Sequence, residues 1–267
     1  MSLTQRNNIN ISGRGKRTMI LAHGFGCDQS MWRLLAPAFH DDYRTVVFDH
    51  VGSGASDLSA YDVDKYGSLH GYAADLLEII REVADAPVVF VGHSVSAMIG
   101  LIASLQAPEL FAALIMVGPS PCYVNDGDYV GGFSREDIDD LLRTLESNYL
   151  GWSSTMAPVI MGAPQHPELG IELTNSLCRT DPEIARHFAR VTFLSDSRSD
   201  LPHTRTPTLI LQCSDDIIAP REVGEYLRRT IPGSTLQIID NIGHCPHLSA
   251  PEASALAMNE FLGPLSL

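Results

Sequence analysis

Three polar side chains, each following an apolar run, have the types and the order needed for nucleophilic catalysis. The first is Ser94, in the segment Gly92–Ser96 (Gly-His-Ser-Val-Ser), between an apolar run at 88–91 and a small-residue helical stretch at 97–103. A serine at a sharp strand-to-helix turn is exposed, and the helix N-terminus beside it stabilises an oxyanion. Position 96 is serine where the G-x-S-x-G pattern has glycine. Serine is also small, so we interpret this segment as a nucleophile elbow.

A serine nucleophile needs a base, and the base needs an acid that orients it. The apolar run at 208–213 predicts a buried strand that ends at the acidic pair 215–216, and the run at 236–240 predicts a strand followed closely by His244. Active sites of open α/β sheets lie at the carboxyl ends of the strands. The order serine, acid, histidine is the one that this kind of elbow uses. We therefore predict a triad of Ser94, His244 and one of the two aspartates.

Each of these residues also has a purely structural interpretation. A serine at such a turn can cap a helix, and aspartates shortly before Pro220 can be turn residues. The segment His244–His247 (His-Cys-Pro-His) could bind a metal ion, but no third and fourth ligands with zinc spacing follow it, so we expect no metal. The coincidence of three candidates, in order and each at a strand end, favours catalysis.

A glycine-rich loop follows the strand expected at 17–22. This loop, His23–Asp28 (His-Gly-Phe-Gly-Cys-Asp), can turn a backbone N–H toward the nucleophile, and we predict Phe25 and Val95 as the two oxyanion donors. Another glycine pattern, at 51–56, superficially resembles a phosphate-binding loop. No helix with an apolar stripe begins there, so we interpret it as a structural turn.

The chain of 267 residues fits one α/β domain in length and pattern. Strands and helices alternate, which predicts a mostly parallel sheet flanked by helices. The alternation stops at about 121–201, where four helical pieces and no convincing strand are expected. We predict a core formed by 1–120 and 202–267, with a helical lid at 121–201 inserted over the carboxyl ends of the strands.

The predicted lid carries many large apolar side chains, more than packing between helices alone would need. Some of these must pack between helices, and others are expected to face a pocket above the nucleophile. The predicted pocket residues are Phe25, Phe133, Trp152, Phe193 and Ile218.

The composition limits the classes of binding partner and the cellular compartment that we expect. With 18 Lys and Arg against 32 Asp and Glu, the formal net charge is −14, which argues against a nucleic-acid partner. No run approaches the ~18–20 apolar residues of a membrane span, and no apolar stretch opens the chain. The scattered cysteines do not form a disulfide framework and suit a reduced compartment. We expect a cytoplasmic protein. The cysteines are Cys27, Cys122, Cys178, Cys213 and Cys245.

Six segments resemble the RsbQ-like family of bacterial stress-response regulators: 23–32, 49–57, 92–100, 117–123, 212–220 and 243–249. The same segments are similar to the plant karrikin and strigolactone receptors of the same α/β-hydrolase branch. The likeness covers nearly the whole chain, lid included. In the karrikin receptors, the motif also has serine at the position of Ser96.

The resemblance implies an α/β-hydrolase fold with a four-helix, V-shaped lid and a closed, largely apolar cavity. It also implies a Ser94–His244–Asp216 triad and an oxyanion hole at Phe25 and Val95. Asp216 rather than its neighbour falls on the family's acid, four positions before a proline.

The expected function is that of a serine hydrolase without a cofactor, acting on a carboxylic ester or lactone of a small hydrophobic molecule in an RsbQ-like signalling role. One alternative is a ligand-binding regulator or receptor with slow turnover that activates a partner phosphatase. Another is a C–C bond hydrolase that uses the same triad.

Overall fold

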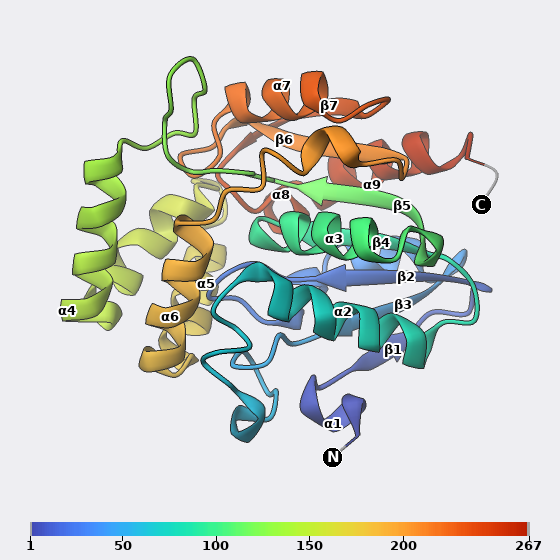
Figure 1. Cartoon of the computed structure of the whole chain (residues 1–267), viewed down its shortest axis with the longest axis horizontal. Coiled ribbons are helices and arrows are strands. Elements are labelled where there is room, and N and C mark those ends of the chain that lie inside the picture. The colour runs from blue at the N-terminus through green and yellow to red at the C-terminus, as the bar shows by residue number, and fades with distance from the viewer. Residues whose placement is uncertain (1, 266–267) are drawn as a thin grey trace.

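The computed structural model describes residues 2–265 and contains a seven-stranded sheet between two layers of helices (Figure 1). The strand order is β1-β3-β2-β4-β5-β6-β7, and only β1 runs antiparallel to its neighbour. The strands are β1 (Asn10–Ser12), β2 (Arg17–Ala22), β3 (Tyr43–Phe48), β4 (Val88–His93), β5 (Phe111–Val117), β6 (Thr208–Asp215) and β7 (Thr235–Ile242). The mostly parallel sheet predicted from the alternating pattern is confirmed.

Alternate side chains of the central strands enter two separate apolar cores. Ile20, Phe90 and Met116 lie in the core covered by α2, α3 and α7, whereas Leu21 and Val91 lie in the core on the opposite face, under α9. Both faces are therefore apolar, which explains why these strands read as continuous hydrophobic runs. The helices of the two layers are α2 (Leu69–Val83), α3 (Val95–Gln106), α7 (Arg221–Thr230), α8 (Pro246–Ser249) and α9 (Pro251–Leu262), and a short α1 (Leu3–Arg6) precedes β1.

A separate group of helices follows β5 and precedes β6, at one end of the sheet (Figure 1). These are α4 (Arg135–Met161), α5 (Pro167–Arg179) and α6 (Pro182–Phe193), called here the helical layer. A non-helical residue, Asn148, divides α4 into two parts, so the layer contains the four helical pieces expected from the sequence. Pro158 lies inside α4 near its end.

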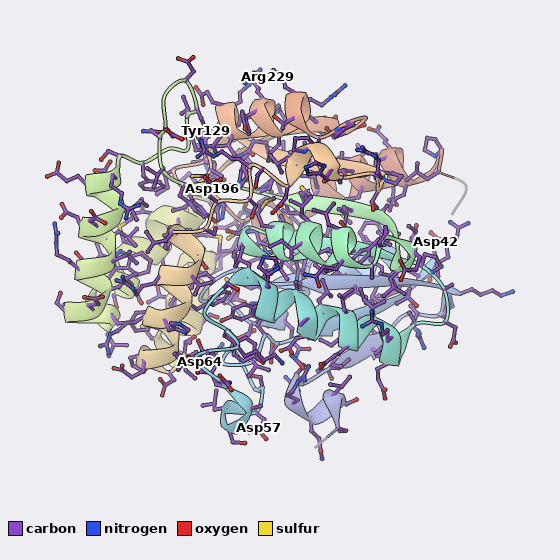
Figure 2. All side chains as sticks on the ribbon, in the orientation of Figure 1. Asp42, Asp57, Asp64, Tyr129, Asp196 and Arg229 are labelled. Atoms are coloured by element: carbon purple, nitrogen blue, oxygen red, sulfur yellow. The ribbon has the colours of Figure 1, made fainter. Side chains whose placement is uncertain are left out.

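The chain enters and leaves the helical layer through adjoining segments. Cys122 and Asp196 form an isolated β-bridge, and the Ser197 N–H donates to the Pro121 carbonyl over 2.8 Å. Arg198 adds an ion pair with Asp196. Figure 2 shows Asp196 close to Tyr129 at this junction, and places Asp42, Asp57 and Asp64 on the periphery of the molecule. Within residues 2–265, no helix has the length and apolar character that a membrane crossing requires.

The antiparallel edge strand β1 was missed by the sequence analysis, and so were α7 and α9. The three residues of β1 are all exposed, so the strand has no apolar alternation to reveal it. It pairs with β3 from Asn10 opposite Val47 to Ser12 opposite Thr45, where the two hydroxyls are 2.9 Å apart.

Candidate active site

Ser94 occupies a strained turn between β4 and α3. Its backbone has φ 56° and ψ −123°, a conformation that non-glycine residues rarely adopt. The Ser94 N–H donates to the Val117 carbonyl of the neighbouring strand over 2.8 Å, and α3 begins at the next residue. The turn thus places the serine side chain at the carboxyl edge of the sheet, beside the first turn of a helix.

A chain of hydrogen bonds joins Ser94 to His244 and Asp216. The Ser94 Oγ lies 2.8 Å from His244 Nε2, and His244 Nδ1 lies 2.7 Å from Asp216 Oδ2. Because a carboxylate can only accept, Nδ1–H donates to Asp216 and Nε2 is left to accept the serine proton. The other carboxylate oxygen accepts the N–H groups of Ile218 and Ala219, which fixes its orientation.

The structure distinguishes between the two neighbouring aspartates. The Asp216 side chain is buried at the end of β6, and its carboxylate contacts the imidazole, whereas Asp215 is exposed. The Asp215 carbonyl instead accepts the N–H of Gly243, which holds the loop before His244 against β6. The arrangement therefore has the geometry predicted for Asp216 as the orienting acid, and its catalytic role remains a prediction.

The glycine-rich loop after β2 approaches the nucleophile closely. A Cβ placed on Gly24 would lie 2.7 Å from His93 Nδ1 and 3.2 Å from Ser94 Cβ, so glycine is needed for this close approach. The N–H groups of Phe25 and Val95 donate no hydrogen bond within residues 2–265. Both amides are thus available to an oxyanion, as the predicted oxyanion hole requires.

The serine that replaces the second glycine of the elbow motif ties α3 to this loop. Ser96 is fully buried, and its hydroxyl donates to the His23 carbonyl, one residue before Gly24. His50 Nε2 lies 2.8 Å from the Ser96 oxygen, and the His50 N–H donates to His23 Nε2 over 3.1 Å. Burial lowers the pKa of His50 well below its usual value, so the imidazole stays neutral. These contacts hold the base of the loop that carries Phe25.

A narrow apolar cavity of about 40 Å³ opens onto the serine and histidine. Four of the five predicted pocket residues line it: Phe25, Trp152, Phe193 and Ile218. Phe193 and Phe25 contact each other edge to face, with ring centroids 6.0 Å apart. The closed, largely apolar cavity that the family resemblance implies is thus present, although it is small.

Phe133 is not among the lining residues. It is half-buried in the loop before α4, where it packs against the apolar cluster of the helical layer. Its N–H donates to the Tyr123 carbonyl over 3.1 Å. The pattern of large apolar residues predicted burial here but could not separate packing between helices from exposure to a cavity.

Polar and sulfur-bearing cavity residues were not found from the sequence pattern. Tyr123 and Thr192 line the cavity, and so do the thiols of Cys27 and Cys245. The Thr192 hydroxyl is buried and has no hydrogen-bond partner within residues 2–265. Burial raises the pKa of Tyr123 to about 12, although its polar contact with Ser94 opposes the rise. Single side chains of this kind come together only through the fold, and no spacing in the sequence reveals them.

The helical layer makes direct contacts with both the histidine loop and the oxyanion loop. The His244 N–H donates to the Ile160 carbonyl near the end of α4 over 2.8 Å. From α5, the Ser176 hydroxyl donates to the Gly26 carbonyl over 3.0 Å, and Arg179 pairs with Asp28 at 2.9 Å. The helices that close the cavity therefore also position the groups around it.

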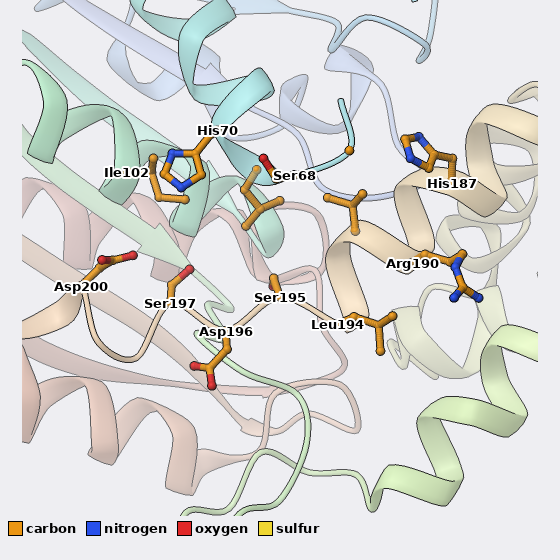
Figure 3. Close-up of a pocket in the computed structure, with 13 residues that line it drawn as sticks. Ser68, His70, Ile102, His187, Arg190, Leu194, Ser195, Asp196, Ser197 and Asp200 are labelled. Atoms are coloured by element: carbon orange, nitrogen blue, oxygen red, sulfur yellow. The ribbon is translucent and has the colours of Figure 1, made fainter. Parts of the chain in front are cut away.

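A larger second cavity, of about 430 Å³, lies where the start of α2 meets the end of α6 (Figure 3). None of the three triad residues lines it. Two of its polar side chains already have partners, because His187 contacts the Tyr61 hydroxyl at 2.7 Å and Arg190 pairs with Glu146 at 3.1 Å. The groups that can do chemistry converge on the smaller cavity instead.

The parallel sheet, the serine elbow and the order of the three residues define a class of hydrolase. Residues 19–257 match the alpha/beta hydrolase family, and the chain belongs to that family.

Relatives in plants and bacteria resemble the chain over almost its whole length. It is 41% identical over 249 residues to a Petunia hybrida protein named karrikin insensitive 2 receptor CA, covering 93% of this chain and 92% of the relative. It is 41% identical to the strigolactone esterase D14 of Arabidopsis thaliana, with 91% of each chain covered. A solved hydrolase from Oleispira antarctica has a TM-score of 0.95 and 44% identity, covering 98% of this chain and 97% of the other.

Replacing each aspartate with asparagine tests which carboxylate orients the imidazole. Asp216→Asn is expected to lower kcat for an aryl ester on the order of 10⁴-fold, because the amide favours the wrong imidazole tautomer. Asp215→Asn, a matched change of an exposed neighbour, is expected to stay within about threefold of the wild type, since surface changes have small effects. Steady-state kinetics of both variants decides the assignment, and the reverse ranking would contradict it.

Replacing Ser96 with alanine tests the connection between α3 and the oxyanion loop. Loss of the two buried contacts of the Ser96 hydroxyl, with the His23 carbonyl and with His50 Nε2, is expected to lower kcat roughly fivefold to tenfold, with little change in KM. Ser104→Ala is the matched control, because that buried serine of the same helix bonds only to the Leu101 carbonyl. Equal kcat values in the two folded variants would show that Ser96 does not support the site.

Proposed function

We propose that the protein is a serine hydrolase that cleaves a carboxylic ester or lactone of a small hydrophobic molecule. The observation that carries this proposal is the hydrogen-bonded chain of Ser94, His244 and Asp216 opening into an apolar cavity. The Ser94 oxygen attacks the carbonyl carbon while its proton passes to His244 Nε2. The N–H groups of Phe25 and Val95 donate hydrogen bonds to the carbonyl oxygen and stabilise the negative charge that develops on it.

Collapse of this intermediate expels the alkoxide of the ester or lactone, which takes the proton from His244. Water then attacks the acyl-serine and gives its proton to His244 Nε2. Collapse of this second intermediate releases the acid and returns that proton to the Ser94 oxygen. Asp216 accepts a hydrogen bond from His244 Nδ1–H and stabilises the imidazolium that forms.

The cavity lining indicates a mostly apolar substrate with a second polar oxygen. Phe25, Trp152 and Phe193 supply aromatic surface on the cavity walls. The unpartnered Thr192 hydroxyl would cost roughly 1–3 kcal/mol if it stayed unsatisfied with a ligand bound. An oxygen of the ligand opposite the scissile carbonyl would give that hydroxyl a partner.

We propose further that residues 121–201 act as a lid on a core formed by 1–120 and 202–267. Cavities that enclose a small ligand are typically about 300–1,000 Å³, far larger than the 40 Å³ available here. The lid must therefore move outward before a substrate reaches Ser94. Lid opening of this kind limits kcat in many enzymes, and we propose that turnover here is slow, as a signal receptor would require.

The names of the plant relatives support a signalling role, since they include both a karrikin receptor and a strigolactone esterase. We propose an RsbQ-like role for this chain, in which binding or hydrolysis of the ligand changes the lid and a partner phosphatase responds. A metabolic esterase would have no ligand-dependent partner.

A kinetic panel of small aryl esters and butenolide lactones tests the proposal. The wild type is expected to hydrolyse members of both groups, with kcat well below the ~10 s⁻¹ that is typical of enzymes. Ser94→Ala is expected to lose about three or more orders of magnitude, because the attacking atom is removed. Ser154→Ala, an exposed serine on α4, is the matched control and is expected to keep the wild-type rate.

Two outcomes would contradict the proposal. Hydrolysis at the wild-type rate by a rigorously purified Ser94→Ala variant would show that Ser94 is not the nucleophile. A kcat at or above that of ordinary esterases would leave the hydrolase in place but would overturn the slow-turnover signalling role.

A further inference from the structure

Behind the catalytic histidine, three side chains that commonly ligate metals lie together in the interior. They are His93 at the end of β4, Cys245 directly after His244, and His247 in α8. One potential ligand atom of each lies within 4.8 Å of those of the other two. Cys245 Sγ is 4.0 Å from His93 Nε2, and the two imidazole rings have centroids 4.4 Å apart. None of the three takes part in the proposed hydrolysis.

Three of the four imidazole nitrogens in this cluster have no hydrogen-bond partner within residues 2–265, whereas His93 Nε2 is bonded to the His244 carbonyl. All three side chains are at most 2% exposed. Neither ring nitrogen of His247 has a hydrogen-bond partner within residues 2–265, and the same holds for Nδ1 of His93. Buried polar atoms without partners cost about 1–3 kcal/mol each, and native proteins satisfy nearly all of them. A bound ion shared by the three side chains would explain why these groups are kept in the interior.

We propose that His93, Cys245 and His247 form a three-coordinate site for one soft monovalent cation, of which Cu(I) is the biological example. Thiolate and imidazole together are the ligands that Cu(I) favours. From the sequence alone, we expected no metal at His244–His247, because no third and fourth ligands with zinc spacing follow this segment. The fold supplies a third ligand from residue 93, which is 152 positions away from Cys245 in the chain.

The charge of the site favours a monovalent over a divalent ion. Imidazole coordinates a metal ion through a ring nitrogen of its neutral form, so the Cys245 thiolate is the one charged ligand among the three. One thiolate and one monovalent cation then give a complex without net charge. A divalent ion with the same ligands would leave one positive charge in the interior, which is costly.

The cation can reach these residues through the catalytic cavity, because His93 and Cys245 line it and His247 lies behind them. The Cys245 thiol is buried beside the two imidazoles. Coordination breaks the S–H bond, forms the S–metal bond and releases one proton to solvent. No group changes its oxidation state.

Binding is expected to suppress hydrolysis, an inference that rests on the proposed function. The His93 Nε2–H donates to the His244 carbonyl over 3.0 Å, and Cys245 is the next residue in the chain. If Nε2 coordinates the cation, this bond to His244 is lost, and movement of the sulfur shifts the His244 backbone. A displacement of about 1 Å in a catalytic group can cost on the order of 10²-fold in rate.

Anaerobic titration of the reduced, full-length protein with Cu(I), held by a competing chromophoric chelator, tests the site. The wild type is expected to take up one tightly bound Cu(I) per chain, with a thiolate-to-copper absorption band. Cys245→Ala and His247→Gln are expected to lose that equivalent. Cys213→Ala, which removes another fully buried thiol outside the cluster, is the matched control and should retain it.

Thermal melting shows whether each variant is folded. If His247→Gln does not fold, Cys245→Ala, which is the smaller change, still tests the site. Uptake that survives in folded Cys245→Ala, or that is lost equally in Cys213→Ala, would overturn the assignment. So would the absence of uptake by the wild type, which would mean that water or packing alone satisfies the cluster. Equally tight binding of Zn²⁺ at the same residues would overturn the choice of a monovalent ion.

A second arm measures ester hydrolysis with and without one equivalent of Cu(I). The wild type is expected to lose at least tenfold on loading, whereas the loaded-to-unloaded ratio in Cys245→Ala should stay near one. An unchanged rate in the loaded wild type would overturn the inhibitory role while leaving the binding site in place. If the wild type hydrolyses no ester, the proposed function fails but the uptake measurement still decides the site.

Discussion

The strained backbone of Ser94 is the constraint on which the site depends. A non-glycine residue at φ 56° costs about 1–3 kcal/mol and persists only where the surroundings enforce it. Here β4 and α3 enforce it by packing against each other without room for side chains at two glycines. A Cβ on Gly92 would lie 2.5 Å from the Ser96 carbonyl oxygen, and one on Gly100 would lie 2.2 Å from the Phe90 ring. The same close packing puts the Ser96 hydroxyl against the loop that carries the oxyanion amide.

The helices over the sheet are as much a part of the site as the sheet itself. The end of α4 accepts a hydrogen bond from the backbone of His244, and α5 contacts the oxyanion loop through Ser176 and Arg179. Exposed ion pairs such as that of Arg179 contribute only about 0–1 kcal/mol, so they do not lock the helices in place. Weak polar contacts of this kind are compatible with the opening movement proposed for these helices.

The triad and the main elements could be predicted because their signals are local. The elbow, the acid and the histidine each follow an apolar strand, and parallel strands bring their carboxyl ends to one edge. Edge strand β1 could not be predicted, because three exposed residues carry no periodicity. The role of Phe133 was predicted incorrectly, because an apolar side chain on a loop gives no sign of whether it packs or faces a cavity. The cluster of His93 with Cys245 depends on residues far apart in sequence, which spacing rules do not detect.

The central claim is that Ser94 forms a covalent acyl intermediate, and it is tested most directly by acid quenching during turnover of an activated aryl ester. Peptide mapping by mass spectrometry is predicted to locate the acyl group on Ser94 alone, and no acyl group should be found in the Ser94→Ala protein. An acyl group on another residue, or turnover with no acylated protein at any quench time, would contradict the account.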